Sequence, residues 1–408
     1  MTAMSSAAAS SVSTQNQDWL VGNPSAVQVA AALWIGSVGL LILGLQPVLL
    51  GALFNEHRID LDMLALVATA EIIAIGVGSA VAAMLFSTRH LRLKSAILLV
   101  ALAALDYAVS FTQTSNAILL VRTLAGVVEG GMVAVSIELI ARSRHAERIG
   151  GIFIALQTVA QCLLVFGLGK WIIQATQAGA TGANASFLVL AVVSLVSVAF
   201  AVLVPAEYGE IPKQKGNIDG VLTLRSILAL LSIFAFFMFV GAIWAFLEPL
   251  GGQNGIDSQT VAFMVSASLA AQVLGALAAT WLQAHIGYRA AILVCSLLGL
   301  AASVVLSISP TLAQFWAAVL VIGFIWMFIV PFMIGQTVDA DSSRSTALLI
   351  PAAQLFGAAL GPLAASMFVV GDDARAVPVF SIGAVIASLM LFGLFLIAAR
   401  RRLTKDVA

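Results

Sequence analysis

The stretch that decides the fold reads SILALLSIFAFFMFVGAIWAFLEPL, residues 226–250. It carries one charged side chain, Glu248, close to its end. A helix needs about 20 apolar residues to cross the hydrocarbon core of a bilayer, so this stretch alone predicts a transmembrane helix. The whole chain agrees with it, because 61% of the 408 residues are hydrophobic and 9% are charged, whereas soluble domains are about 45–50% apolar. The composition therefore predicts an integral membrane protein.

The apolar runs favour helices over the strands of a membrane barrel. Only helices and closed barrels satisfy every backbone polar group in lipid, and barrel strands alternate apolar and polar residues, which these runs do not. At about 20 residues per crossing, we predict an all-α membrane protein with twelve transmembrane helices in two sets of six. The first six are expected at 27–54, 62–86, 95–111, 117–140, 150–173 and 185–204, and the second six at 226–250, 258–283, 288–308, 312–338, 346–369 and 377–399.

The basic residues predict the orientation of this layout, because Lys and Arg concentrate on the cytoplasmic side of membrane proteins. Of the 19 basic residues, 15 fall on one side; only Arg58, Lys170 and Arg375 fall on the other, and Arg122 lies within a span. We therefore expect both termini in the cytoplasm and a location in the cell (inner) membrane. The expected organisation is an N-terminal tail at 1–26, a six-helix bundle at 27–204, a cytoplasmic linker at 205–225, a second six-helix bundle at 226–399 and a C-terminal tail at 400–408.

The two halves also resemble each other in sequence. Gln157 in span five aligns with Gln354 in span eleven, and the loops at 88–94 and 285–289, after spans two and eight, are both short and basic. Many secondary transporters are built from such internal repeats, with the binding site near the midplane between them.

Two motifs resemble those of the major facilitator superfamily, and the resemblance extends from residue 27 onward. Residues 282–289, LQAHIGYR, are similar to the superfamily's loop signature Leu-Ala-Asp-Arg-x-Gly-Arg-Arg, although Ala284 stands where the family has Asp. Arg122 followed by Gly126 is similar to the fourth-helix motif that is associated with proton coupling. The resemblance implies two bundles related by a pseudo-twofold axis, with spans seven and ten on the cavity and span three outside it.

The chain departs from the superfamily pattern at two places. The loop in the first half that corresponds to the signature has lost its Asp and its Gly and keeps only basic residues. The Gly-Pro motif of the family's fifth helix, which is linked with antiport, is absent from span five, while a similar string, GAALGP, occurs at 357–362 in span eleven. The direction of transport therefore stays open.

Four ionisable residues lie inside apolar runs of the first half: Glu71, Asp106, Arg122 and Glu129. Intramembrane charges are costly and usually pair or line a watery pathway. Asp106 and Arg122 each lie eight residues from Thr114 in a tight turn, so at about 1.5 Å per residue both sit roughly 12 Å below it and can meet. They can form a structural ion pair, which we favour for Asp106, or take part in transport.

The two glutamates have distinct expected roles. Glu129 lies two helical turns after Arg122 on nearly the same face, so we expect it to act in proton coupling or binding, with a polar contact to a neighbouring helix as the alternative. Glu71 has no evident partner in the sequence. It fits a proton carrier, with a neutral, hydrogen-bonded glutamate as the alternative. Glu138 and Glu248 lie near span ends, where we expect water to reach them. The candidate proton-coupling residues are thus Glu71, Glu129 and Asp106.

Aromatic and amide side chains are the candidates for substrate binding, because ligand sites are mostly apolar with a few orienting polar groups. Spans seven and ten are rich in aromatic residues, and Trp244 and Trp326 are the best candidates in them. Gln161 and Gln272 are further amides inside spans. The proposed substrate-binding set is Arg122, Gln46, Gln157, Trp244, Trp326, Gln336 and Gln354.

Other function classes find no support in the sequence. Cys162 and Cys295 lie in opposite halves, so we expect neither a disulfide nor a metal site, and no cofactor. Gly169-Lys170 lacks the leading glycine of a phosphate loop, which leaves ATP-driven transport unsupported. We also expect no enzyme activity and no nucleic-acid partner.

These observations together favour a secondary transporter. Our first hypothesis is a proton-coupled transporter with alternating access that acts as a monomer. Its expected partners are the lipid bilayer, protons and a small amphipathic or aromatic compound, which is anionic if Arg122 binds it. One alternative is efflux of apolar drugs, in which Arg122 only tunes the carboxylates. An alternative of another class is a non-transporting receptor or a channel-like protein.

Overall fold

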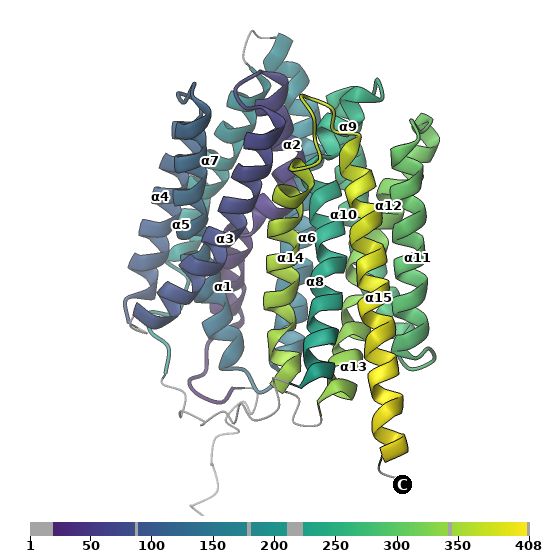
Figure 1. Cartoon of the computed structure of the whole chain (residues 1–408). Helices are drawn as coiled ribbons and strands as arrows, with labels where there is room; N and C mark the ends of the chain where they lie inside the picture. The colour runs from purple at the N-terminus through teal and green to yellow at the C-terminus, as the bar shows by residue number, and fades with distance from the viewer. Residues whose placement is uncertain (1–18, 86–88, 178–180, 210–222, 342–344, 406–408) are drawn as a thin grey trace, which may run out of the picture.

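The computed structural model describes residues 19–85, 89–177, 181–209, 223–341 and 345–405. Within these ranges the chain forms long helices that stand side by side (Figure 1). The first half holds α1 (Ala26–Val38), α2 (Leu41–Asn55), α3 (Leu61–Leu85), α4 (Leu91–Val109), α5 (Ser115–Ala141), α6 (Ala146–Gln177) and α7 (Gly182–Ala201). The second half holds α8 (Leu224–Ala245), α9 (Leu247–Gln253), α10 (Ser258–Leu282), α11 (Tyr288–Ser307), α12 (Leu312–Phe328), α13 (Val330–Ala340), the 3-10 helix η1 (Ser345–Leu349), α14 (Ile350–Ser366) and α15 (Ala376–Lys405).

Each of the twelve expected spans corresponds to a helix or a broken helix. Span one is α1 with α2, span seven is α8 with α9, span ten is α12 with α13, and span eleven is η1 with α14. Among the described residues, nine helices are long and apolar enough to cross a membrane, counting α1 with α2 as one, and the bent α12–α13 pair makes a tenth. The other two are α14, which is apolar but has 17 residues, and α4, which carries Arg92, Lys94 and Asp106 in 19 residues. Most of the expected N-terminal tail (1–18) and linker (210–222) lies outside the described residues, as do residues 406–408.

The sharpest break coincides with a proline. The chain bends by 42° between α12 and α13, and Pro331 stands in the first turn of α13. Proline lacks the N–H that would continue the hydrogen-bond ladder, and its ring clashes with the preceding turn. The bend therefore follows directly from the sequence.

The helix contacts recur in the two halves. In the first half α3 packs on α5, and α4 packs on α5 and α7; in the second half their counterparts do the same, α10 on α12 and α11 on α12 and α15. Between the halves, α3 meets α14 and α6 meets α10. The first contact joins spans two and eleven, and the second joins spans five and eight. Spans two and eight are counterparts in the two halves, and so are spans five and eleven, so exchanging the halves converts one contact into the other. The two bundles are thus related by a pseudo-twofold axis, as expected.

The halves are joined by hydrogen bonds at one end and in the middle. We call the end where α7 finishes and α8 begins the linker end, at the bottom of Figure 1, and the opposite one the distal end. At the distal end, Asn55 donates to Glu248 at 3.0 Å and to Ser258 at 3.2 Å. Further in, Trp244 Nε1 donates to the carbonyl of Leu43 at 2.8 Å. The hydrogen bonds between described residues of the two halves thus lie at the distal end and further in.

Candidate functional site

Arg122 on α5 is the centre of an ionic cluster that draws on three helices. Its Nη1 lies 2.6 Å from Oδ1 of Asp106 on α4, and its Nη2 lies 3.4 Å from Oε1 of Glu129 on α5. The same Nη2 donates to Oε1 of Glu71 on α3. One guanidinium therefore faces three carboxyl groups.

The cluster is sealed from solvent. Arg122 and Glu71 expose none of their surface, and Asp106 and Glu129 expose 2% and 3%. The ring of Phe187 on α7 lies over the guanidinium, with Cζ 5.3 Å from the ring centroid. Not every polar atom is satisfied, because Oε2 of Glu71, Oε2 of Glu129 and Nε of Arg122 have no hydrogen-bond partner.

Small residues bring the helices of this cluster together. A Cβ on Gly126 would collide with the carbonyl oxygen of Glu71, and one on Gly130 would collide with that of Ile75. On the facing helix, a Cβ on Gly78 would meet the backbone of Val127. Backbones that approach this closely are typical of small residues at membrane helix interfaces. This contact places Glu71 within reach of Arg122.

The structure confirms part of the predicted arrangement of charges and corrects the rest. Asp106 and Arg122 form an ion pair, as their equal depth indicates, and Glu129 shares the face of Arg122. Glu71, which has no evident partner in the sequence, pairs with Arg122 because α3 packs on α5. The expectation that water reaches Glu248 is wrong, since its side chain is buried against α2 with 4% of the residue exposed.

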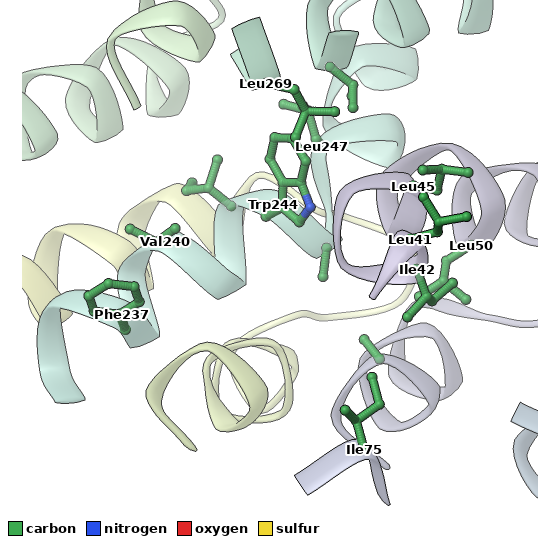
Figure 2. Packing of buried hydrophobic residues seen from close by; sticks show 14 of the residues in the cluster. Leu41, Ile42, Leu45, Leu50, Ile75, Phe237, Val240, Trp244, Leu247 and Leu269 are labelled. Atoms are coloured by element: carbon green, nitrogen blue, oxygen red, sulfur yellow. The ribbon is translucent and has the colours of Figure 1, made fainter. Parts of the chain in front are cut away.

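A separate cavity of about 230 Å³ lies between the two halves. Its lining comes from α2, α3 and α6 of the first half and from α8, α10, α12 and α14 of the second. Trp244 and Trp326 meet edge to face in its wall, with ring centroids 5.3 Å apart at 82°. Figure 2 shows the Trp244 ring beside Leu269, with α2 residues Leu41 and Leu45 nearby.

Five glutamines line this cavity: Gln46, Gln157, Gln161, Gln272 and Gln354. Gln161 Nε2 donates to the carbonyl of Leu40 at 2.7 Å, and Gln46 Nε2 donates to that of Ala68 at 3.4 Å. The amide nitrogens of Gln272 and Gln354 are buried without a hydrogen-bond partner. The cavity therefore offers two amide donors that are available for hydrogen bonds to a ligand.

Solved structures of transporters share this architecture at low sequence identity. A bacterial homologue of the human lysosomal transporter Spinster, in its inward-facing and occupied conformation, aligns with a TM-score of 0.70 at 13% identity, covering 91% of this chain and 96% of that one. Its unoccupied inward-facing form gives 0.67 at 12% identity, over 93% and 98%. The nucleoside transporter NupG gives 0.66 at 15% identity, over 91% and 99%. The chain has the major facilitator superfamily fold. No family model and no curated protein matches the sequence.

The seven expected substrate-binding residues do not all lie at the cavity. As implied for spans seven and ten, α8 and α12 reach the cavity, and five of the expected substrate residues line it: Gln46, Gln157, Trp244, Trp326 and Gln354. Two do not. Arg122 is enclosed in the ionic cluster, and Gln336 is buried on α13, where it donates to Ser232 at 3.0 Å.

The loop at 282–289, which is similar to the superfamily signature, makes contacts at the linker end. Gly287 is the residue before α11, and Tyr288 donates from its hydroxyl to Asp339 on α13 at 2.6 Å. Arg225 at the start of α8 also reaches Asp339, at 3.0 Å. The signature thus helps to tie α8, α11 and α13 together.

Sequence reasoning missed that one helix of this superfamily fold touches every part of the site. On α3, Glu71 faces the ionic cluster, Ile72 lines the cavity, and Thr69 donates to the carbonyl of Ala359 on α14 at 2.6 Å. The three residues lie within four positions of one another. The clustering of Thr69 and Glu71 in an otherwise apolar span was the available signal.

Proposed function

We propose that the protein is a proton-coupled secondary transporter that moves a small organic compound by alternating access. The observation that carries the proposal is the cluster of three carboxyl groups around the single guanidinium of Arg122 in a sealed site. If all four groups were ionised, the site would hold two uncompensated negative charges. Burying net charge is costly, and interacting carboxyls share protons instead. The cluster is therefore suited to hold and release protons.

The contacts suggest how the three carboxyl groups divide the work. Asp106 approaches the guanidinium at 2.6 Å and fixes one side of it. Glu71 and Glu129 share the other terminal nitrogen, and each has a second oxygen without a partner. Those free oxygens are where protons would bind. We assign proton transfer to Glu71 and Glu129, and orientation of Arg122 to Asp106.

The position of the contacts between the halves supports alternating access. The distribution of basic residues favours a cytoplasmic linker end, with both termini in the cytoplasm of a cell whose inner membrane holds the protein. The hydrogen bonds between halves lie in the middle and at the distal end. This conformation then corresponds to an inward-facing state.

Helix α3 supplies a physical route for coupling. Breaking or forming the ion pair between Glu71 and Arg122 would shift α3. The same helix carries Ile72 in the cavity wall and Thr69 at the contact with α14. Binding at the cavity and protonation at the cluster would thus favour the same rearrangement, which is what linkage between two sites requires.

The proposal is tested in proteoliposomes that contain a pH-sensitive dye. A panel of organic acids, lipophilic cations and uncharged heteroaromatic compounds is added outside vesicles under an imposed pH gradient, and substrate-dependent proton movement is recorded. We expect Glu71→Gln and Glu129→Gln to abolish proton movement while substrate exchange without a gradient continues.

Glu138→Gln is the matched control. It lies on the same helix as Glu129, but its side chain is 26% exposed and pairs with Arg142. Proton movement that survives in both cluster variants, or no proton movement with any compound in the wild-type protein, would rule the proposal out.

A further inference from the structure

Among the residues that the structure describes, no charged side chain lines the cavity between the halves. All 18 lining residues are apolar, aromatic, hydroxyl or amide residues. A charged ligand would lose its hydration there without gaining a countercharge, which is strongly unfavourable. Arg122 is the basic residue within a span that the sequence offered for binding an anion. It exposes none of its surface and is paired with Asp106 and Glu71.

Two amide donors in the cavity lack partners. Gln272 on α10 is 3% exposed, and its Nε2 has no hydrogen bond; the same holds for Nε2 of Gln354 on α14. A buried donor without a partner is unfavourable, because it has lost its hydrogen bond to water and gained none in the protein. Both belong to the lining of one cavity, so a single ligand with two acceptor groups would satisfy them together.

The aromatic wall and the size of the cavity narrow the ligand further. The hydrogen bond from Trp244 Nε1 to the carbonyl of Leu43 fixes the Trp244 ring, which packs edge to face against Trp326. A flat ring can pack against such a pair. The volume of about 230 Å³ is below the roughly 300–1,000 Å³ of most ligand pockets, which favours a compact compound.

Resting on the transport function proposed above, we infer that the substrate is an uncharged, planar heteroaromatic compound of one or two rings that carries carbonyl or ring-nitrogen acceptors. Gln272 and Gln354 donate to those acceptors, and the indole of Trp326 packs on the ring. Carboxylates and cations of the same shape are rejected because the wall holds no countercharge.

The test is equilibrium binding to the purified full-length protein in detergent, measured by calorimetry. The probes form a matched set: nicotinamide, its anionic counterpart nicotinate, its cationic counterpart 1-methylnicotinamide (methylated on the ring nitrogen), and the uncharged bicyclic compound hypoxanthine. We expect an uncharged probe to bind at least about tenfold more tightly than its charged counterparts. Preference for the anion or the cation, or no binding of any probe, would overturn the inference.

Substitutions then locate the contacts. Gln272→Leu and Gln354→Leu should each weaken binding of the uncharged probe by about tenfold, and Trp326→Leu should weaken it while Trp326→Phe restores most of it. Gln314→Leu is the matched control, because Gln314 is an exposed residue of α12 outside the cavity. Unchanged thermal unfolding of each variant separates loss of contact from loss of fold. Full affinity in both cavity glutamine variants would contradict the assignment.

The two proposals fail in different ways. Proton-coupled movement of a carboxylate or a cation would leave the transport proposal standing and refute the substrate class. Binding of an uncharged probe without proton-coupled movement would leave the substrate class standing and refute the transport proposal.

Discussion

The contact of α3 with α5 in the first half and that of α10 with α12 in the second half occupy equivalent places in the two bundles. Both depend on glycine: a Cβ on Gly130 would meet the backbone of α3, and one on Gly323 would meet the backbone at Ser268 of α10. What fills the neighbouring space differs completely. The first contact encloses the cluster around Arg122, whereas the second is flanked by Phe324 and Phe328, stacked 5.4 Å apart at 22°.

The difference teaches that the fold does not need the buried charges. The second half achieves the same packing with aromatic and small residues, and Ser268 satisfies its hydroxyl locally by donating to the carbonyl of Val319 at 3.1 Å. Buried ion pairs contribute little net stability compared with apolar residues of similar size. The packing therefore does not require the charges of the first half, and substitutions can separate their proposed functional role from a structural one.

Removing the cation should have the largest effect. Arg122→Leu leaves three buried carboxyl groups without their partner, and breaking a buried pair costs about 3–5 kcal/mol. We expect a corresponding loss in the free energy of unfolding, measured by chemical denaturation in detergent, together with loss of proton movement. Arg289→Leu, at an exposed site, should change stability by less than about 1 kcal/mol. If both variants lost the same free energy of unfolding, leaving the three carboxyl groups without Arg122 would cost no more than removing an exposed arginine.

Making the first half resemble the second should reverse most of that loss. A protein with Arg122→Leu, Glu71→Leu, Asp106→Leu and Glu129→Leu buries no charge at this contact. We expect its unfolding free energy to return to within about 2 kcal/mol of the wild type, because replacing a whole buried ionic network is often neutral or stabilising. Proton movement in proteoliposomes should remain absent. A quadruple variant less stable than Arg122→Leu would show that the cluster is a structural element after all.

The glycines should matter equally in the two halves. Gly130→Ala and Gly323→Ala each force a Cβ against backbone atoms of the facing helix, and overpacking of this kind costs about 1–3 kcal/mol. Gly167→Ala on α6 is the matched control, since no atom lies within 4 Å of the added Cβ, and it should be neutral or slightly stabilising. Thermal unfolding of the three variants measures this. A large cost at only one of the two contacts would break their equivalence.

The limits of sequence reasoning are visible at the same two contacts. The spans were predictable because hydropathy and length alone define a membrane helix. The pair of Asp106 and Arg122 was predictable because a short turn fixes the depth of residues on consecutive helices. The pairing of Glu71 with Arg122 was not predictable, because α3 and α5 are not consecutive helices. Which faces of these two helices meet depends on how each is rotated about its own axis, and in the sequence only the glycine pattern indicates this.

The same reasoning applies to the position of Arg122. Depth can be counted along a helix, but the direction of a side chain around the axis is hidden when nearly every face is apolar. Arg122 was therefore assigned to the cavity, although it lies in the cluster. The cavity glutamines were easier to find because each is an isolated amide in an apolar run.

The smallest effect concerns the starts of α3 and α10, which are equivalent helices. Asp60 accepts from the backbone N–H of Met63 at 2.7 Å, and Asp257 accepts from that of Thr260 at 2.9 Å. Replacing either with Ala removes an N-terminal cap, which costs about 0.5–2 kcal/mol. We expect similar losses from Asp60→Ala and Asp257→Ala in chemical denaturation at pH 7.

At Asp257 the loss should also depend on pH. The hydrogen bond from Thr260 holds the pKa of this carboxyl below its ordinary value of 3.8. A lowered pKa means that the carboxylate stabilises the fold fully above pH 3.8 and that this contribution disappears as the pH falls through the lowered value. The difference between wild type and Asp257→Ala should therefore shrink in acid. Asp257→Asn, which keeps a capping oxygen without a charge, should retain most of the stability at pH 7 and show no such dependence; a difference that grows in acid would contradict the capping role.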